Sequence, residues 1–525
     1  MAQHVSIKEP VRAPARRTIR VRPDKWWMLG AVSTATFMLL LDVTVVNVAL
    51  PEIQRTLGAS FTQLQWVVDA YALTLAAFLL TAGTLADQLG RKRIFVIGLA
   101  IFTVASLLCG LAPGAVALDL ARAAQGVGGA VMYAVAPAMI AQQFHGSQRG
   151  LAFGISGGIT GLAVAIGPLL GGVLTAVSWR WVFLLNVPVG VLVTLVLLTR
   201  VAESKDRERQ RVDWPGVSIF SVALTVLVFT LIRGGTIGWT NPLTVSLFAG
   251  AAGLLGAFVA VERSRPDAML DLSLFRNTSF NGLSLSTLAI NAAINVALLF
   301  QILYVQYVLG FTAFETGLRY LPMTIVVFLA AAVAGTLSTR IPARLFLGAG
   351  SVALGIGLLL ISGSHLGASW TNMLPGMIVS GFGMGLFNPA RAATAVALVP
   401  LSQAGMSSGI SETFQQVGVA VGVAALGSVG QSQIRESFAS ATADVGHSAQ
   451  LTDLVASGRL TEAVDAVPAE QRAIVTNAAG QALVDGLQVV LTTGGVIAIL
   501  GGLVAFALVR NRDLYATDPE SHSSP

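Results

Sequence analysis

Four ionisable side chains lie inside apolar stretches of this 525-residue sequence, and they are the residues whose types and positions suggest chemistry. Asp42, Asp69, Arg122 and Glu412 each stand among Val, Leu, Ala and Gly residues. An ionisable group at membrane depth is costly, so it is by default a hypothesis about function. Low-dielectric surroundings favour the protonated form of a carboxyl group, and a nearby cation favours the charged form. We therefore interpret the three acids as sites where a proton and a cation compete.

The composition indicates that these side chains lie in membrane helices. Hydrophobic residues make up 54% of the sequence and charged residues 11%, whereas a soluble domain carries about a quarter charged residues. A helix needs roughly 20 apolar residues to cross a bilayer. Fourteen windows meet that length, at 26–50, 63–86, 93–112, 115–141, 149–175, 179–200, 213–233, 241–262, 281–308, 316–339, 343–363, 370–399, 404–432 and 484–509. We thus predict an all-α membrane protein with 14 transmembrane helices.

The depth of each side chain follows from the helical rise. The first predicted span runs outward and the fourth runs inward, so Asp42 and Arg122 both lie roughly 10 to 12 Å below the outer surface. We expect these two residues and Asp69 to form one acid–base group. In the second half Glu412 shares a helical face with Gln415. A purely static role, such as an Asp42–Arg122 pair that holds two helices together, stays open as the alternative for each acid.

Lys and Arg are distributed unequally between the two predicted sides. On the predicted topology 24 of them fall on the side of the amino-terminal tail and seven on the opposite side, with Arg391 counted among the former and Arg233 among the latter. Because cytoplasmic segments carry the excess of basic residues, we expect both termini in the cytoplasm and a multi-pass protein of the cell inner (plasma) membrane. The net charge of +6 then reflects the orientation of the protein in the membrane, and we expect no nucleic-acid partner.

Other kinds of chemistry have little support in the sequence. Cys109 is the single cysteine, and the five histidines are scattered without the spacing of metal ligands. The sequence contains no GxxxxGK[ST] phosphate-binding loop. We expect no metal, no cofactor and no enzymatic activity.

An internal repeat organises the predicted spans. The residue types at 57–58 and 83–85 recur at 309–310 and 335–337, both offset by 252 residues. This offset pairs the first two spans with the ninth and tenth, which gives a 6+2+6 arrangement with a substrate path between the halves. The predicted segments are a basic cytoplasmic tail (1–25), an amino-terminal six-helix half (26–200), a cytoplasmic linker with two inserted helices (201–262), a cytoplasmic connector (263–280), a carboxy-terminal six-helix half (281–510) whose extracytoplasmic loop 433–483 forms a helical cap, and a cytoplasmic tail (511–525).

The loop between the second and third spans combines glycines, an acid and cations. Gly83 and Asp87 precede Gly90, Arg91 and Lys92. An acid at a helix terminus and a cluster of cations can lock against neighbouring helix ends in one state and release them in another. This stretch resembles the GxLaDrxGrkxx loop of the major facilitator superfamily. Cations that merely fix the topology are the alternative, and the repeat in the second half lacks an acid, so we expect that half of the gate to be weaker.

Further stretches resemble the 14-span drug:proton antiporters of that superfamily, the QacA/EmrB-like branch. Residues 41–51 read LDVTVVNVALP and match its LDxTvVNvALP signature, and residues 118–128 match its LxxxRxxqGxg pattern around Arg122. The antiporter motif gxxxGPxxGG is matched except at its first position, where Ala163 stands and Gly161 is the nearest glycine. The matching residues are Gly167, Pro168, Gly171 and Gly172.

The resemblance implies the major facilitator fold and a proton-coupled exporter of lipophilic, often cationic drugs or toxic metabolites. Such a protein works by alternating access, is driven by the proton gradient without a cofactor, contacts membrane lipids and is expected to be monomeric. The resemblance places the coupling acids at Asp42, Asp69 and the region of Glu412. Relatives carry another acid in the tenth span, where this sequence has Arg319 and Tyr320, which disfavours dicationic cargo.

Candidate contacts for cargo are polar or aromatic residues on helices expected to face the path, because aromatic rings stack on flat cations. They are Asn47, Tyr71, Tyr133, Tyr304, Phe414 and Gln415. Two other functions stay open. One is a dedicated exporter of an endogenous lipid or secondary metabolite, and the other is a non-transporting membrane receptor or lipid-handling protein.

Overall fold

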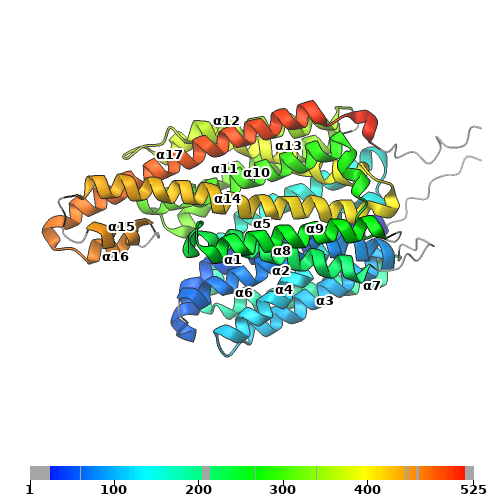
Figure 1. Ribbon diagram of the computed structural model, residues 1–525, viewed down its shortest axis with the longest axis horizontal. Helices are drawn as coiled ribbons and strands as arrows, with labels where there is room; N and C mark the ends of the chain where they lie inside the picture. Colours follow the sequence, from blue (N-terminus) through cyan, green and yellow to red (C-terminus); the bar gives the residue numbers. More distant parts are fainter. Residues whose placement is uncertain are drawn as a thin grey trace, which may run out of the picture.

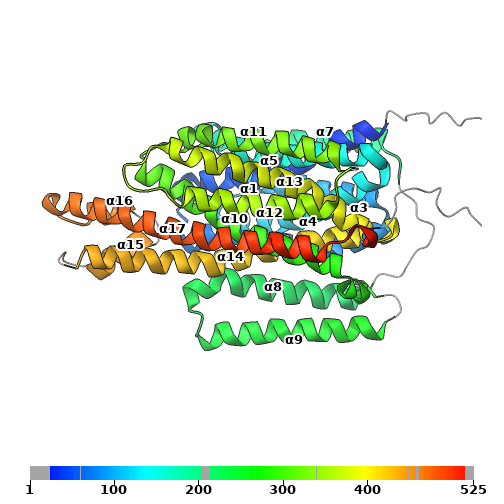
Figure 2. The same ribbon diagram turned by 90° about the horizontal axis from the view of Figure 1, so that it is seen from above.

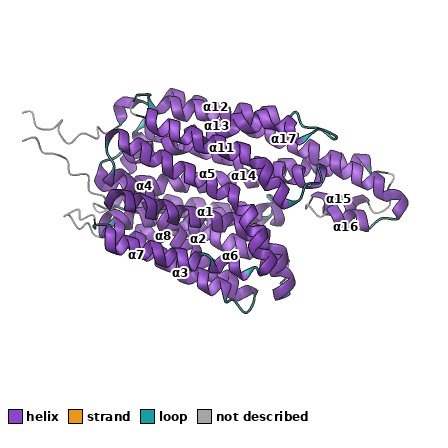
Figure 3. Ribbon diagram, turned by 180° about the vertical axis from the view of Figure 1, so that it is seen from behind, coloured by secondary structure: helices purple, strands orange, loops and turns teal. Residues whose placement is uncertain are grey.

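A computed structural model describes residues 24–59, 61–203, 213–265, 268–338, 340–443, 445, 448–456 and 460–514. The predicted basic tail before residue 24, most of the linker and the last eleven residues lie outside this part of the chain. Within the described residues the regular elements are helices (Figure 3). They are α1 (Asp24–Leu57), α2 (Phe61–Leu89), α3 (Arg91–Gly110), α4 (Ala115–Gln143), α5 (Gly146–Val177), α6 (Arg180–Leu184), α7 (Asn186–Arg200), α8 (Trp214–Ile237), α9 (Pro242–Ser264), α10 (Thr278–Leu303), α11 (Ala313–Leu337), α12 (Ala343–Ile361), α13 (Leu374–Ala397), α14 (Ala404–Ala441), α15 (Ser448–Ala456), α16 (Leu460–Asp465) and α17 (Ala469–Leu508), with short 3-10 or π turns at η1 (Leu272–Arg276), η2 (Tyr304–Val308), η3 (Trp370–Met373), η4 (Leu401–Gln403) and η5 (Asn511–Asp513).

Polar side chains determine where several of these helices begin. Asp213 and Asn241 accept hydrogen bonds from backbone N–H groups in the first turns of α8 and α9, and Asn277 does so for α10. At α11, Thr312 and Glu315 form a reciprocal capping box. Such caps satisfy backbone donors that have no partner inside the helix.

The helices form two packed halves with an inserted pair at one side. Helices α1 to α7 make up one half and α10 to α17 the other, and the long helices of both run roughly along the same direction (Figure 1). Helices α8 and α9 lie beside this bundle, with α9 outermost (Figure 2). The start of α1 and the end of α17 lie at the same end of the bundle, which we call the terminal end (Figure 1).

Twelve of the helices in the described part of the chain are long and apolar enough to cross a membrane. Helices α5 and α13 are not among the twelve, although they have 32 and 24 residues and correspond to two predicted windows. Helix α5 includes residues whose side chains lie outside the described part of the chain, and α13 carries Asn388 and Arg391. They nevertheless pack inside the bundle, α5 against α1 and α11, and α13 against α11 and α12.

The inserted helix α8 contacts both halves. It packs against α2 of the first half and α14 of the second. Thr81 on α2 and Ser221 on α8 are hydrogen-bonded at 3.2 Å between their hydroxyl oxygens, and Trp66 stacks on Phe229 with ring centroids 6.2 Å apart. The insertion therefore covers the line along which α2 meets α14.

The segment predicted as a cap at 433–483 is largely helical. The ends of α14 and α17 extend into it, and α15 and α16 pack against these two helices. All four project beyond the end of the bundle opposite the terminal end (Figure 1). Helices α14 and α17 thus reach 38 and 40 residues, longer than a bilayer requires.

Candidate functional site

A cavity of about 390 Å³ lies between the two halves, within the size range of pockets that bind drug-sized ligands. Helices α1, α2, α4 and α5 line it from the first half, and α10, α13 and α14 line it from the second. Most lining residues are apolar, and the charged ones among the described residues are Arg122, Arg391 and Glu412. Six carboxamide side chains also line the wall, namely Asn47, Asn291, Asn295, Asn388, Gln415 and Gln416.

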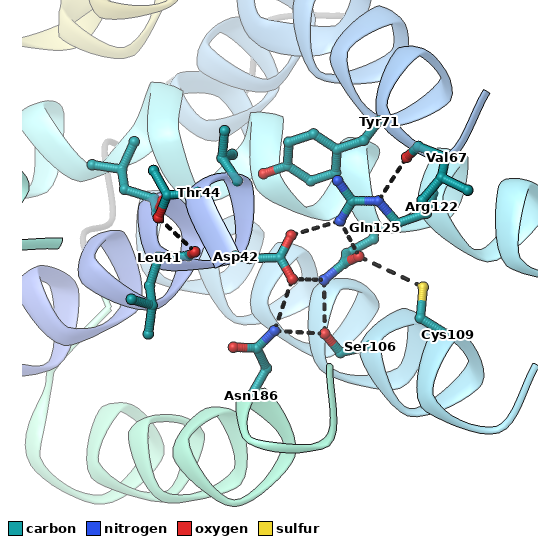
Figure 4. Close-up of polar contacts among 12 residues, drawn as sticks. Leu41, Asp42, Thr44, Val67, Tyr71, Ser106, Cys109, Arg122, Gln125 and Asn186 are labelled. Carbon is teal, nitrogen blue, oxygen red and sulfur yellow. Dashed lines mark hydrogen bonds and ion pairs between the residues drawn. The ribbon is translucent and has the colours of Figure 1, made fainter. Parts of the chain in front are cut away.

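Asp42 lies at the centre of a buried polar cluster beside the cavity (Figure 4). Arg122 Nη1 donates to Asp42 Oδ2 at 2.6 Å, and the two side chains are 2% and 0% exposed. Gln125 and Asn186 donate to Asp42 Oδ1 at 2.9 and 3.0 Å, and both also donate to the Ser106 hydroxyl. The carboxylate therefore has three nitrogen donors from α4 and α7. The predicted proximity of Asp42 and Arg122 is present in the structure.

Arg122 connects this cluster to the cavity wall. Its Nε donates to the Val67 carbonyl oxygen at 3.0 Å, and its guanidinium carbon lies 4.1 Å from the centre of the Tyr71 ring. These contacts hold the guanidinium between Asp42 and an aromatic face, a geometry that suits the planar arginine head group.

Glu412 forms a second buried ion pair, with Arg391 of α13. Arg391 Nη2 donates to Glu412 Oε1 and Oε2 at 3.0 and 3.3 Å, and its Nη1 donates to the Ser411 hydroxyl at 2.9 Å. Gln415, one helical turn further along α14, donates to the Tyr133 hydroxyl at 2.8 Å. Glu412 and Arg391 line the cavity themselves, whereas Asp42 lies behind Arg122.

The structure corrects the predicted grouping of Asp69 with Asp42 and Arg122. Asp69 Oδ2 lies 3.2 Å from Arg233 Nη2, and Arg233 belongs to the inserted helix α8. Arg233 also donates to Gln65 and stands over the Trp66 ring, with its guanidinium carbon 5.0 Å from the ring centre. Arg233 and Arg391, which we counted as charges outside the membrane core, are thus both partners of buried or half-buried acids. Arg391 stands well inside an apolar window, and the cost of a charge at membrane depth would have identified it.

The predicted gate loop contacts the start of α14 at the terminal end. Asp87 Oδ1 accepts hydrogen bonds from Arg91 Nη2 at 2.7 Å and from the Gly405 backbone N–H at 3.0 Å. Asp87 Oδ2 accepts one from the Met406 N–H at 2.8 Å, and Arg91 also donates to the Leu401 carbonyl. A carboxylate at a helix N-terminus satisfies free N–H groups and interacts favourably with the helix dipole. Asp87 therefore joins the two halves.

Glycines on both sides of the bundle permit close contact between the halves at this end. A Cβ on Gly83 would lie 2.0 Å from the Gly405 carbonyl oxygen, and one on Gly335 would lie 2.4 Å from the Gly150 carbonyl oxygen. Gly83 and Gly335 are the repeat-related residues, so the two halves contact each other in equivalent ways although the second contact lacks an acid. Gly90 has φ 105°, and Lys92 of the same loop donates to the Val201 carbonyl within the first half.

Three of the four antiporter-motif glycines face neighbouring helices. A Cβ on Gly167 would lie 1.9 Å from the Thr44 hydroxyl oxygen, and one on Gly171 would lie 3.1 Å from Val48 Cβ. Gly161 faces Val327 on α11 instead, at 2.8 Å. An added Cβ on Gly172 would have no described heavy atom within 4 Å, and the side chain of Pro168 lies outside the described residues. The motif thus allows α5 to pack closely on α1 and α11.

Four of the six candidate cargo contacts line the cavity, namely Asn47, Tyr71, Tyr133 and Gln415. Tyr304 does not, because its hydroxyl donates to the His365 carbonyl and its ring is buried in the core of the second half. Phe414 also packs against that core. Gln125 belongs to the predicted 118–128 motif, but no sequence signal indicated that Gln125 or Asn186 binds Asp42.

Two packed helical halves with a partly polar cavity at their interface define a multi-pass membrane transporter. The chain belongs to the Major Facilitator Superfamily, whose family model matches residues 32–423. This assignment also places it among transporters rather than enzymes.

Several known proteins are similar to this chain. Multidrug resistance protein Stp of Mycobacterium tuberculosis is 38% identical over 404 residues, which cover 76% of this chain and 75% of that protein. The probable actinorhodin transporter of Streptomyces coelicolor is 35% identical over 472 residues, covering 87% and 81% of the two chains. A solved structure of the proton:xylose symporter XylE bound to 6-bromo-6-deoxy-D-glucose has a TM-score of 0.61 at 12% identity, over 94% of this chain and 98% of that one, so it shares the fold.

Proposed function

We propose that this protein is a drug efflux transporter that exchanges protons for lipophilic drugs or toxic metabolites by alternating access. The similar proteins include one named for multidrug resistance and one named as a transporter of actinorhodin, which supports export of small organic molecules. The main observation that supports the proposal is the position of Glu412 in the cavity wall. Its carboxylate lines the cavity, is 3% exposed, and has a single arginine as its ionic partner.

This arrangement allows a proton and cargo to compete. Protonating Glu412 removes its attraction to Arg391, whereas cargo that donates a hydrogen bond to the carboxylate favours the charged form. Each ligand thus weakens binding of the other by the same factor, which is the condition for coupled exchange. No cofactor takes part, and the proton gradient supplies the driving force.

Asp42 and Asp69 are weaker candidates for coupling in this state. Asp42 does not line the cavity and already accepts three hydrogen bonds, which supports a static role that holds α1 against α4 and α7. Asp69 is paired with Arg233, which supports a role in docking the inserted helix.

The proposal includes the 14-span topology, with six spans in each half, two inserted spans and both termini in the cytoplasm. Under this topology the terminal end faces the cytoplasm, and the contacts of Asp87 with α14 close the cavity on that side. The structure then corresponds to a state that is closed on the cytoplasmic side. A single chain contains a complete cavity, which supports a monomer in the plasma membrane surrounded by lipid.

The test uses proteoliposomes with an imposed pH gradient, in which intravesicular pH is followed as cargo is added. We expect wild type to discharge the gradient when cargo is present and Glu412→Gln to fail. Glu436→Gln, on the exposed part of the same helix, is the matched control and should behave as wild type. Asp42→Asn is compared in parallel; if it abolishes exchange while Glu412→Gln does not, the assignment of the coupling acid is wrong.

Two other functions remain distinguishable by the same assay. A dedicated exporter of an endogenous lipid or secondary metabolite would discharge the gradient with that molecule and not with drugs. A receptor or lipid-handling protein without transport would show no proton flux with any cargo.

A further inference from the structure

The two carboxylates that the described residues place at or beside the cavity are each paired with an arginine. Glu412 is paired with Arg391, and Asp42 is paired with Arg122. Among the described residues that line the wall, Glu412 is the single acid, against the two arginines. A cargo cation entering this cavity would lose hydration without meeting an unpaired carboxylate, and burying a charge without a partner is strongly unfavourable.

One of the three aromatic side chains that line the described wall, Tyr71 beside Tyr133 and Phe153, is already in contact with a cation. The Tyr71 ring lines the cavity, but the guanidinium carbon of Arg122 stands 4.1 Å from its centre. A second cation on this ring would be repelled by the first. Arg122 therefore already makes, on Tyr71, the cation–π contact that a cationic drug would need there.

The wall instead offers hydrogen-bonding groups that carry no charge. Asn291 and Asn295 on α10 donate to carbonyl oxygens of their own helix at 2.8 and 3.1 Å, which leaves their amide oxygens as acceptors. Gln415 uses one N–H on the Tyr133 hydroxyl. Apolar residues such as Leu39, Phe153 and Met384 form much of the remaining wall.

From these observations we propose that the cargo is uncharged rather than cationic, a lipophilic molecule with hydroxyl or N–H donors and carbonyl acceptors. This inference rests on the proposed export function and names the chemical class of its substrate. Hydroxyl or N–H groups of such a molecule pair with the amide oxygens and with the Glu412 carboxylate. Its apolar part contacts the apolar wall, so the cavity needs no counter-charge.

The test compares two cargo probes with the same ring and different charge. One is 2-(hydroxymethyl)anthraquinone, which is uncharged, and the other is 2-(trimethylammoniomethyl)anthraquinone, a permanent cation. Binding to the purified full-length protein in detergent is measured by quenching of its tryptophan fluorescence. We expect the uncharged probe to bind at least tenfold more tightly, and equal or tighter binding of the cation would overturn the proposal.

A substitution in the cavity tests the same argument from the protein side. Arg391→Gln leaves Glu412 without its counter-charge, and we expect it to move the affinity ratio toward the cation by about tenfold. Arg391→Lys keeps the charge and should keep the wild-type ratio. Because Arg391→Gln can fail to fold, Gln416→Leu provides a second variant, which should weaken the uncharged probe more than the cation. A ratio unaffected in both Arg391→Gln and Gln416→Leu contradicts the proposal.

The failure of this proposal is distinguishable from failure of the proposed function. Proton flux in proteoliposomes with either probe reports export, whereas the affinity ratio reports the class of cargo. If the cationic probe drives proton flux and also binds more tightly, the proposal of proton-coupled export stands and the proposal of an uncharged cargo is contradicted. Absence of flux with both probes argues against export, and a preference for the uncharged probe in binding would still support the description of the cavity.

Discussion

Replacing Gly83 by Ala places a methyl group between α2 and α14. The added Cβ would lie 2.0 Å from the Gly405 carbonyl oxygen and 2.7 Å from its carbonyl carbon, whereas ordinary contacts begin at 3.4 Å. The neighbouring atoms are backbone, so they cannot rotate away. The helices must separate at the terminal end.

The size of the effect follows from the cost of overpacking, which is about 1–3 kcal/mol for an extra methyl group in a close-packed site. This cost applies to the state in which the two halves touch at the terminal end and is relieved when they part. The equilibrium should therefore move about 5- to 150-fold toward the state open at that end.

The assay measures access of a thiol reagent to a reporter cysteine in the contact. Ser408 on α14 is 1% exposed, so Ser408→Cys is shielded while the end is closed. The native Cys109 is buried and contributes little background. We expect the Gly83→Ala substitution to raise the labelling rate of this reporter by the factor given above.

Gly250→Ala is the matched control, because it makes the same change in the middle of α9 with no described heavy atom within 4 Å of the added Cβ. If Gly83→Ala and Gly250→Ala label at the same rate, α2 and α14 do not approach each other at Gly83, and the closed gate described above is refuted.

Three further outcomes are expected. Arg122→Met leaves Asp42 as an unpaired buried charge and should lower the unfolding free energy by about 3–5 kcal/mol; an unchanged melting temperature in detergent would contradict the buried pair. Arg233→Gln removes the pair with Asp69, whose side chains are 12% and 16% exposed against 2% and 0% for Arg122 and Asp42. The unfolding free energy should therefore fall by less than in Arg122→Met, and an equal or larger loss would contradict this ranking. Replacing residues 443–467 by a short Gly/Ser linker removes α15 and α16, which pack on the ends of α14 and α17; vesicle export should persist, and its loss would assign these helices a role in transport.

Much of the fold followed from the sequence because membrane helices have a strong local signal. The predicted windows correspond to helices, and the Asp42–Arg122 pair followed from helical rise and direction alone. The pairing of Asp69 with Arg233 did not, because no local pattern indicates where an inserted helix docks on a bundle. The partners of Asp87 were also hidden, since backbone N–H groups at Gly405 and Met406 have no signature in the side-chain sequence. Arg391 was misassigned because it was counted with the basic residues on the side of the amino-terminal tail, although it lies inside the predicted window 370–399.

The position of α8 makes the two lines of contact between the halves unequal. Along α5 and α11, side chains such as Phe328 and Leu329 are exposed at the periphery, so lipid reaches this line directly. Along α2 and α14, helix α8 packs against both helices and covers the line of contact. A molecule dissolved in the bilayer therefore has a preferred flank from which to approach the cavity, in spite of the near-symmetry of the two halves.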